Sequence, residues 1–428
     1  MPYTAKRLTA GAAAVAIASM ALTACAGGAP ADKTEQVTQL TIPMAETPWL
    51  PSFEKIVADY EAKTGIDIVL RTFPMAGLLT QEANAAQSGS NGFDLFLINE
   101  QWVGQFYDNE WVQPLADIDP DFKWDENLIE FDGVGRWDAD TRTTSLDGEP
   151  YSLPINGNIH LFMYRKDLYE QLGLKVPTTW DEVVKNGEAA QAAGVVDDGY
   201  VLRGKTPAYD FSAVLYSFGG KWFEDERGGD WRPAIDSPEG KAALEQFKAL
   251  ADIGPAAPQT IAQAEATSLM QGGSVLQATF VAAVAAPLED KDASLVADKI
   301  GYAVLPGQTP ASGTWTMGVP YGLPEDRSQA AYDFLTWLTS KDAMQAWAGY
   351  GGITTRTDIE SDRPELKAIV DSADMIRGGF RYAFAPAMVK AVEPIMSQYL
   401  AGAIDVDTAL AQMSDAMTTV VTEAGYLK

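Results

Sequence analysis

The sequence predicts an α/β fold in which strands alternate with helices along the chain. Three observations support this prediction. Short apolar runs of strand length recur, amphipathic runs at helical spacing separate them, and glycine or proline stands at the junctions. Such alternation is typical of an α/β domain with a largely parallel sheet.

The first predicted unit is a strand, a helix and a second strand. Residues 39–42 form a short apolar run, which we expect Pro43 to end. Apolar side chains recur at helical spacing over residues 53–60, and Gly65 stands where a helix C-cap belongs. Residues 66–73 return to strand character, which completes the unit.

Later elements follow from local signals of the same kind. Residues 93–98 are compatible with a buried parallel strand. Thr179 and Glu182 fit a capping box, and Ser237 with Pro238 opens another helix. The remaining expected elements are two strands and two mainly helical stretches, at residues 275–279, 300–305, 328–348 and 387–422.

Charge and rare residues exclude several classes of function. The formal net charge is −28, and a field of that sign repels phosphate backbones, so we expect no nucleic-acid partner. One Cys and one His cannot form an internal disulfide or a zinc site, and we expect no metal and no cofactor. Asp117, Asp119 and Asp121 resemble the start of a calcium loop, but Phe122 and Leu128 stand where that loop needs Gly and Glu.

The N-terminus has the architecture of a secretory signal. Lys6 and Arg7 precede an uncharged apolar run, residues 8–22, that is shorter than the roughly 20 residues of a bilayer span. The ending Leu-Thr-Ala-Cys resembles the lipobox of bacterial lipoproteins, which implies cleavage after residue 24 and a lipid on Cys25. An uncleaved helix with an incidental Cys is the alternative.

We therefore interpret residues 1–24 as a signal peptide and residues 25–37 as a lipidated, flexible tether of small and polar residues. This predicts an extracytoplasmic protein anchored to the outer face of the cell membrane through Cys25. We find no other stretch that is long and apolar enough to cross a membrane.

Several sequence blocks resemble extracellular solute-binding proteins of carbohydrate ABC transporters, of the maltose-binding-protein-like family 1 type. That family shows a YxLP, YxKDL and PxTWDE series at this relative position. The similarity runs from about residue 39 to the C-terminus, and the order of the blocks is more specific than any one of them. The blocks are Tyr151–Ile155, Leu161–Leu168, Pro177–Glu182, Phe218–Gly220, Gly301–Gly307, Gly313–Trp315 and Ala331–Ser340.

The resemblance implies a two-lobed periplasmic-binding-protein-like fold of type II, with a ligand cleft between lobes joined by hinge strands. Lobe one would comprise residues 38–153 plus 306–352, and lobe two residues 154–305 plus 353–428. It also implies delivery of the bound solute to the permease subunits of an ABC importer. We expect a monomer that is not an enzyme.

Sugar sites combine flat aromatic rings with polar groups that read hydroxyls. Trp315, between two glycines, is the first stacking candidate; Trp49, Trp102 and Trp222 follow predicted strands or glycines. Burial in a core is the alternative for each Trp. Other candidates come at strand ends, at the presumed crossover between lobes or in the sequence blocks above, and a solvated loop role is the alternative for the polar ones. These candidates are Glu46, Asn99, Glu100, Gln101, Asn156, Asn158, Gly220, Thr279, Gly313 and Tyr350.

Two charged residues need separate treatment. Arg203 precedes a loop expected to reach the cleft, where it would suit an anionic group; a salt bridge elsewhere is the alternative. His160 lies in an apolar run, and we expect it to be a hydrogen-bonded structural residue.

The sequence thus predicts extracellular capture of a small carbohydrate: a monosaccharide, a polyol or a small glycoside. An anionic sugar or another solute is the alternative. A secreted glycoside-acting enzyme is a more remote one, because no GxSxG, HExxH, Walker A or GxGxxG motif is present.

Overall fold

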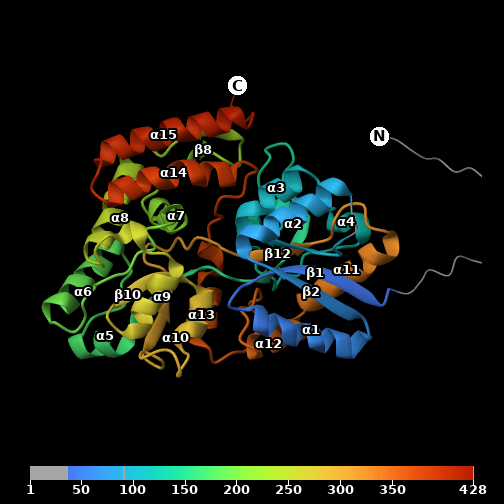
Figure 1. Ribbon diagram of the computed structural model, residues 1–428, viewed down its shortest axis with the longest axis horizontal. Coiled ribbons are helices and arrows are strands. Elements are labelled where there is room, and N and C mark those ends of the chain that lie inside the picture. Colours follow the sequence, from blue (N-terminus) through green and yellow to red (C-terminus); the bar gives the residue numbers. More distant parts are fainter. Residues whose placement is uncertain (1–36, 90–91, 428) are drawn as a thin grey trace, which may run out of the picture. The chain divides into compact units, whose positions relative to one another are not determined.

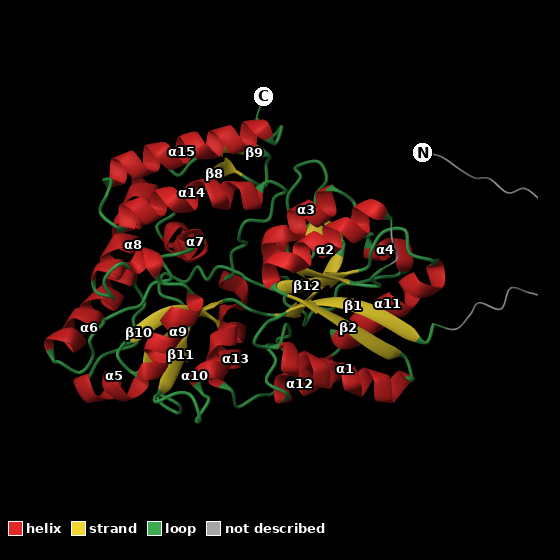
Figure 2. Ribbon diagram, in the orientation of Figure 1, coloured by secondary structure: helices red, strands yellow, loops and turns green. Residues whose placement is uncertain are grey.

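The structure, a computed structural model, describes residues 37–89 and 92–427, which belong to one compact unit that begins at Val37. The predicted signal peptide, Cys25 and all of the tether except Val37 lie outside the described residues. The fold is α/β with two lobes, each a small sheet flanked by helices (Figures 1 and 2). The limits predicted for the lobes stay a prediction.

Lobe one holds a three-stranded sheet in the order β3-β12-β6 and a parallel pair, β1 and β2, beside it. The helices α1 and α12 pack together, and α11 packs on α4, β1 and β6. The elements of lobe one are β1 (Gln39–Ala45), α1 (Leu50–Thr64), β2 (Asp67–Phe73), α2 (Met75–Ser88), β3 (Phe96–Asn99), η1 (Glu100–Trp102), α3 (Val103–Asp108), α4 (Leu115–Ile118), η2 (Phe131–Gly133), β4 (Arg136–Trp137), β5 (Glu149–Pro150), β6 (Ser152–Asn156), β12 (Trp315–Gly318), α11 (Glu325–Leu338) and α12 (Lys341–Gly349).

Lobe two holds a second three-stranded sheet, in the order β10-β7-β11. The helices α7, α8, α14 and α15 pack against one another, and Figure 1 shows them together at one end of this lobe. The elements of lobe two are β7 (His160–Arg165), α5 (Lys166–Leu172), α6 (Trp180–Ala192), α7 (Pro207–Ser217), β8 (Phe223–Asp225), β9 (Asp230–Pro233), α8 (Pro238–Asp252), η3 (Pro258–Thr260), α9 (Gln263–Gly272), β10 (Gln277–Val281), η4 (Ala282–Val284), α10 (Ala285–Leu288), β11 (Ile300–Ala303), α13 (Pro364–Ser372), η5 (Ala373–Met375), α14 (Ala385–Leu400) and α15 (Val406–Glu423).

Local signals in the sequence set several of these elements. The apolar face predicted for α1 is buried, and Gly65 ends the helix in the left-handed conformation at φ 74°. The capping box of Thr179 and Glu182 is present at the start of α6. Ser237 caps α8 and accepts a hydrogen bond from the Gly240 N–H. These predictions are confirmed.

Two details of the predicted strands are wrong. β1 continues through Pro43 to Ala45, because the restricted φ of proline is compatible with an extended strand. The sheets are not largely parallel: β1 and β2 pair in parallel, whereas every other pairing between the described strands is antiparallel. The segment that returns from lobe two supplies β12, and it runs against both β3 and β6.

The chain passes between the two sheets or the helices packed on them three times: between β6 and β7, between β11 and β12, and between α12 and α13, through residues 157–159, 304–314 and 350–363. A further segment, residues 376–381, runs beside the second of these passages, where Ala311 and Arg377 form a parallel bridge. One region of the molecule brings together four loops. Two of them follow β1 and β3 of lobe one, and the other two come before α7 and after β10 of lobe two. None of the described helices is long and apolar enough to span a bilayer.

Candidate functional site

A cavity of about 560 Å³ lies where the two lobes meet, and we take it as the candidate ligand site. Lobe one contributes the loop between β1 and α1, the end of β3 and the start of β12. Lobe two contributes the N-terminal turn of α7, the end of β10 and one face of α14. The lining residues are Glu46, Thr47, Pro48, Trp49, Met75, Asn99, Gln101, Asn158, Arg203, Thr206, Tyr209, Gln263, Val281, Ala283, Ser312, Gly313, Trp315, Val389 and Glu393.

Two indole rings form the aromatic part of this lining. Trp315 is the first residue of β12, and its backbone lies between Asn99 on β3 and Asn156 on β6. Trp49 packs edge-on against it, with ring centroids 6.0 Å apart. Both side chains are only 4% exposed, so the rings are held firmly while part of each still reaches the cavity. This is the kind of rigid apolar surface that packs against the C–H face of a sugar.

Amide side chains at the cavity also stabilise the loops that carry them. The Asn99 side chain caps η1 by accepting a hydrogen bond from the Gln101 N–H at 3.1 Å. The Asn158 side chain accepts one from the Ala283 N–H at 3.0 Å, which ties the first passage between the lobes to the turn after β10. Amides placed in this way can donate to and accept from hydroxyl groups.

Arg203, which lines the cavity, forms a buried cluster with Asp210 and His160 behind it. Nε of Arg203 donates to Asp210 at 2.9 Å, and its Nη1 donates to Oε1 of Gln263 at 2.7 Å. Nε2 of His160 lies 2.9 Å from the same carboxylate, and the His160 side chain is fully buried. His160 is thus a hydrogen-bonded structural residue, as predicted.

The cluster is electrostatically balanced. Burial lowers the pKa of His160, and this outweighs the opposite effect of the Asp210 carboxylate. Burial by itself would raise the pKa of Asp210, but the Arg203 guanidinium and His160 hold it below its ordinary value. The cluster therefore carries an Arg–Asp ion pair beside a neutral imidazole.

Glu393 on α14 is a half-buried carboxyl in the cavity lining. Burial raises its pKa to about 7, and the backbone N–H of Ala208 in the first turn of α7 opposes this rise. Glu46, on the lobe-one side, is exposed. Among the described residues neither of these two carboxylates forms a salt bridge.

The structure brings many of the predicted site residues together in this one cavity. They come from five separate stretches of the chain, which only the fold makes adjacent. The predicted residues that line the cavity are Glu46, Trp49, Asn99, Gln101, Asn158, Arg203, Gly313 and Trp315.

Three of the other predicted residues lie in the interior of lobe one or at its edge. Glu100 is 1% exposed and pairs with Arg381, with 2.6 Å between Oε1 and Nε. Trp102 packs edge-on against Trp315, behind the cavity wall. Asn156 on β6 is fully buried. A ligand contact by these residues stays a prediction.

The remaining predicted residues lie away from the cavity. Trp222 is buried in lobe two and donates from Nε1 to Ser212, and Gly220 packs against Leu215. Thr279 is buried on β10. Tyr350 lines a neighbouring hollow of about 160 Å³ that shares Pro48 and Trp49 with the cavity.

Sequence reasoning missed several lining residues, among them Thr206, Tyr209, Gln263, Ser312 and Glu393. Of these residues, only Ser312 had a signal in the sequence, because it directly precedes the predicted site residue Gly313. The others lie in helices or before them, and nothing in their local pattern distinguishes them from ordinary surface residues. Only the packing of α7, α9 and α14 places them at the cavity.

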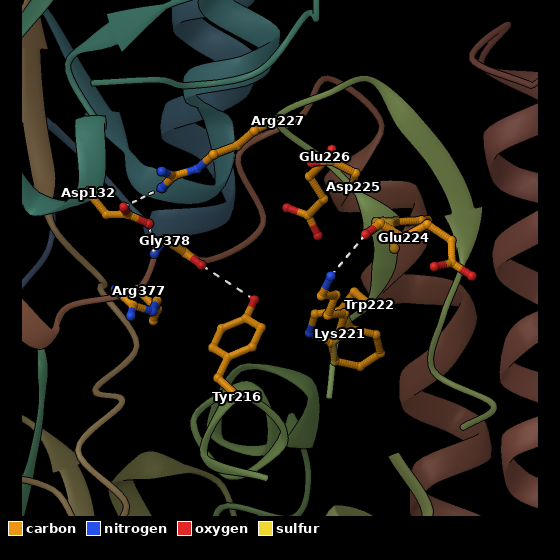
Figure 3. Close-up of a pocket in the computed structure, with 11 residues that line it drawn as sticks. Asp132, Tyr216, Lys221, Trp222, Glu224, Asp225, Glu226, Arg227, Arg377 and Gly378 are labelled. Atoms are coloured by element: carbon orange, nitrogen blue, oxygen red, sulfur yellow. Dashed lines mark hydrogen bonds and ion pairs between the residues drawn. The ribbon is translucent and has the colours of Figure 1, made fainter. Parts of the chain in front are cut away.

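A second cavity, of about 430 Å³, lies at another junction between the lobes (Figure 3). Asp132 of η2 accepts hydrogen bonds from Arg227, in the turn between β8 and β9, and from the Gly378 N–H. Burial raises the pKa of Glu226 in its lining to about 7. Most side chains in the described lining of this second cavity are charged. That lining has one Trp and no Asn or Gln, whereas the first cavity has two packed indoles and several amides.

Comparison with known proteins relates the chain to one family. The family model described as bacterial extracellular solute-binding protein matches residues 46–345. A mannitol-binding protein of Pseudomonas aeruginosa is 29% identical over 273 residues, which are 60% of this chain and 58% of that protein.

Two solved structures resemble the fold. Maltose-bound MalE3 of T. maritima has a TM-score of 0.74 at 21% identity, covering 89% of this chain and 99% of that one. A solute-binding protein of Agrobacterium vitis with bound D-mannitol has a TM-score of 0.68 at 24% identity, covering 91% and 100%. At these identities the likeness concerns the fold alone.

Proposed function

The chain belongs to the family of bacterial extracellular solute-binding proteins, and on this premise we propose that it captures a small carbohydrate for an ABC importer. A monosaccharide, a polyol or a small glycoside would bind in the cavity between the lobes. The observation that carries this proposal is the lining of the cavity, in which Trp49 and Trp315 of lobe one occur together with amide, hydroxyl and carboxylate groups of lobe two. The printed name of the mannitol-binding relative and the mannitol in the A. vitis structure support the same chemistry.

The proposed mechanism is closure of the cleft on the ligand. A ligand that contacts both lobes binds more tightly when the lobes are close together than when they are apart. It therefore shifts the equilibrium toward the closed arrangement. The closed form would then dock on membrane permease subunits. Because the proposal is one of capture and release, it includes no catalytic step.

We further propose that a signal peptide is removed after residue 24 and that a lipid on Cys25 holds the chain at the outer face of the membrane. The basic, apolar and small-residue series ending in Leu-Thr-Ala-Cys supports this. Expression of the full chain in a bacterial host, followed by membrane fractionation and mass measurement, tests it. A Cys25→Ser variant that stays membrane-bound with unchanged mass would contradict it.

A thermal-shift panel of sugars and polyols tests the capture proposal. A ligand at 100 times its Kd stabilises the folded state by about 2.7 kcal/mol, which raises Tm measurably. We expect at least one neutral carbohydrate to do so. If no carbohydrate shifts Tm, or if amino acids and peptides alone do, the proposal is wrong.

A further inference from the structure

The charges at the cavity are distributed unevenly. Among the described residues of its lining, Arg203 is the one cationic side chain, whereas Glu46 and Glu393 are carboxylates outside any salt bridge. An Arg in a binding cleft ordinarily suits an anion. Whether it does so here depends on what its guanidinium already contacts.

Each of the three guanidinium nitrogens of Arg203 already has a partner within the protein. Nε and Nη2 form a two-pronged contact with Asp210, which is only 5% exposed, and Nη1 donates to Gln263. Arg203 itself is 7% exposed. A ligand carboxylate could replace the neutral Gln263 at Nη1, but the buried Asp210 carboxylate already balances the charge of this guanidinium, so the Arg203–Asp210 pair offers an anion no net positive charge.

Glu393 removes another feature that would favour an anion. The N-terminal turn of α7 faces the cavity through Thr206 and Tyr209, and the free N–H groups of a helix start attract negative charge. The N–H of Ala208 in this turn lowers the pKa of the Glu393 carboxyl, which lies beside it in the cavity lining. That end of the helix is therefore supplied with an anion by the protein itself.

Burial decides which of the two carboxylates matters more. Glu46 is exposed, so water and salt screen its charge. Glu393 is half-buried, so its charge acts through a medium of lower dielectric constant. An ionised Glu393 can accept hydrogen bonds from hydroxyl groups, but it repels a carboxylate.

We propose, on the premise that this cavity is the carbohydrate site, that it selects its ligand by charge and that Glu393 is the residue that decides. The cavity binds uncharged polyols and sugars, also binds their amino-deoxy derivatives, and rejects the corresponding sugar acids. Arg203 is a positioning residue for the cavity wall and does not receive an anion.

Matched ligands test this selection. For each of the mannitol, glucitol and ribitol skeletons, the alditol, the 1-amino-1-deoxy alditol and the aldonate are titrated calorimetrically against the purified chain at pH 8. At that pH Glu393 is mainly ionised, since its pKa is about 7. On each skeleton that binds, we expect the aldonate to bind at least about tenfold more weakly than the alditol, because one unit charge at contact range separates them. We expect the amine to bind at least as tightly as the alditol.

A Glu393→Gln variant identifies the residue responsible. It keeps the shape of the side chain, so the ratio of aldonate Kd to alditol Kd should fall several-fold, a change that a purely structural role would not produce. Glu423→Gln, which removes the same charge from the exposed end of α15, should leave the ratio unchanged.

The outcomes separate the two proposals. If the aldonate binds as tightly as the alditol, or more tightly, the charge selection is wrong while carbohydrate capture stands. If Glu393→Gln leaves the ratio unchanged, the assignment to Glu393 is wrong. If none of the nine compounds binds and no member of the wider sugar panel binds either, the capture proposal is wrong, and the charge selection is wrong with it.

Discussion

At the scale of single residues, a buried ion pair holds together segments that are distant in the sequence. Glu100 accepts from the Arg381 Nε, from the Thr314 N–H at 2.9 Å and from the Gly379 N–H at 2.8 Å. Arg381 also donates to the Phe131 carbonyl at 2.6 Å. The pair thus joins the ends of β3 and η2 to the segments that lead into β12 and α14.

Arg381→Met should therefore destabilise the protein strongly. It leaves the Glu100 carboxylate buried without a cation, and breaking a buried pair in this way costs about 3–5 kcal/mol. Urea unfolding measures the loss. Arg232→Met, which breaks a solvent-exposed pair with Asp230, should cost far less, because water and salt screen that pair.

A second variant distinguishes a charge effect from a packing effect. Glu100→Gln combined with Arg381→Met removes both charges, so it should recover part of the stability lost in the single variant. If the double variant is less stable than Arg381→Met by the full cost of a second independent change, the ion pair is not the reason for the loss.

His160 should make stability depend on pH. Its pKa in the folded protein lies below the unfolded value of about 6.5, so the unfolded state binds the extra proton first as pH falls. Stability contributed by the neutral imidazole is present above pH 6.5 and is lost below it. His160 is the one histidine of the chain, which makes the effect assignable.

The measurement is the free energy of unfolding in urea at pH 7.5 and at pH 5.5, for the native chain and for His160→Gln. The native chain should lose more stability over this interval than the variant, because glutamine does not titrate. Other groups, such as Glu226 with its raised pKa, contribute equally to both proteins and cancel in the comparison. Equal losses would contradict the prediction.

At the scale of elements, local signals define where helices begin and end. The Thr179 side chain accepts from the Glu182 N–H, and the Glu182 carboxylate accepts from the Thr179 N–H at 3.3 Å. This reciprocal contact satisfies N–H groups that the first turn of α6 cannot pair internally. It explains why the start of α6 could be predicted from four residues.

Thr179→Ala should lower the free energy of unfolding by about 1 kcal/mol, because the cap is lost while the rest of α6 is unchanged. Thermal or urea unfolding detects this. Thr418→Ala on the exposed face of α15 is the matched control, and it should be neutral or slightly stabilising because alanine favours a helix. Equal losses in the two variants would mean that the capping box contributes nothing.

At the scale of the whole molecule, an ion pair at the second cavity should influence ligand binding at the first, because both cavities lie between the two lobes. Asp132 and Arg227 form an ion pair between η2 of lobe one and the β8–β9 turn of lobe two (Figure 3). The pair exists in the arrangement in which residues of both lobes also line the ligand cavity. Removing it should therefore make this arrangement less favourable relative to more open ones.

Arg227→Gln should weaken carbohydrate binding without touching the ligand cavity. The Arg227 side chain is 52% exposed, so the pair is worth less than about 1 kcal/mol, and Kd should rise by no more than about fivefold. X-ray scattering should show a larger mean radius of gyration for the ligand-free variant. Arg232→Gln, within the same hairpin, should change neither quantity; an unchanged Kd for Arg227→Gln would contradict the prediction.

The sequence by itself determined the α/β class, a few helix limits and the first loops of the site. These depend on interactions between near neighbours, such as the left-handed Gly65 and the capping box of α6, which a linear pattern records. Trp49, Asn99 and Gln101 could be proposed for the cavity because they lie at the end of a strand or in the loop after one.

Only the tertiary structure decided which side chains share the cavity and what charge they present. Arg203 is neutralised by Asp210, whose role depends on how α7 packs, and Glu393 arrives from α14, far along the chain. Trp222 and Glu100 have sequence surroundings as suggestive as those of Trp315, yet they do not line the ligand cavity. Burial and ion pairing arise between residues that are distant in sequence, so no local pattern contains them.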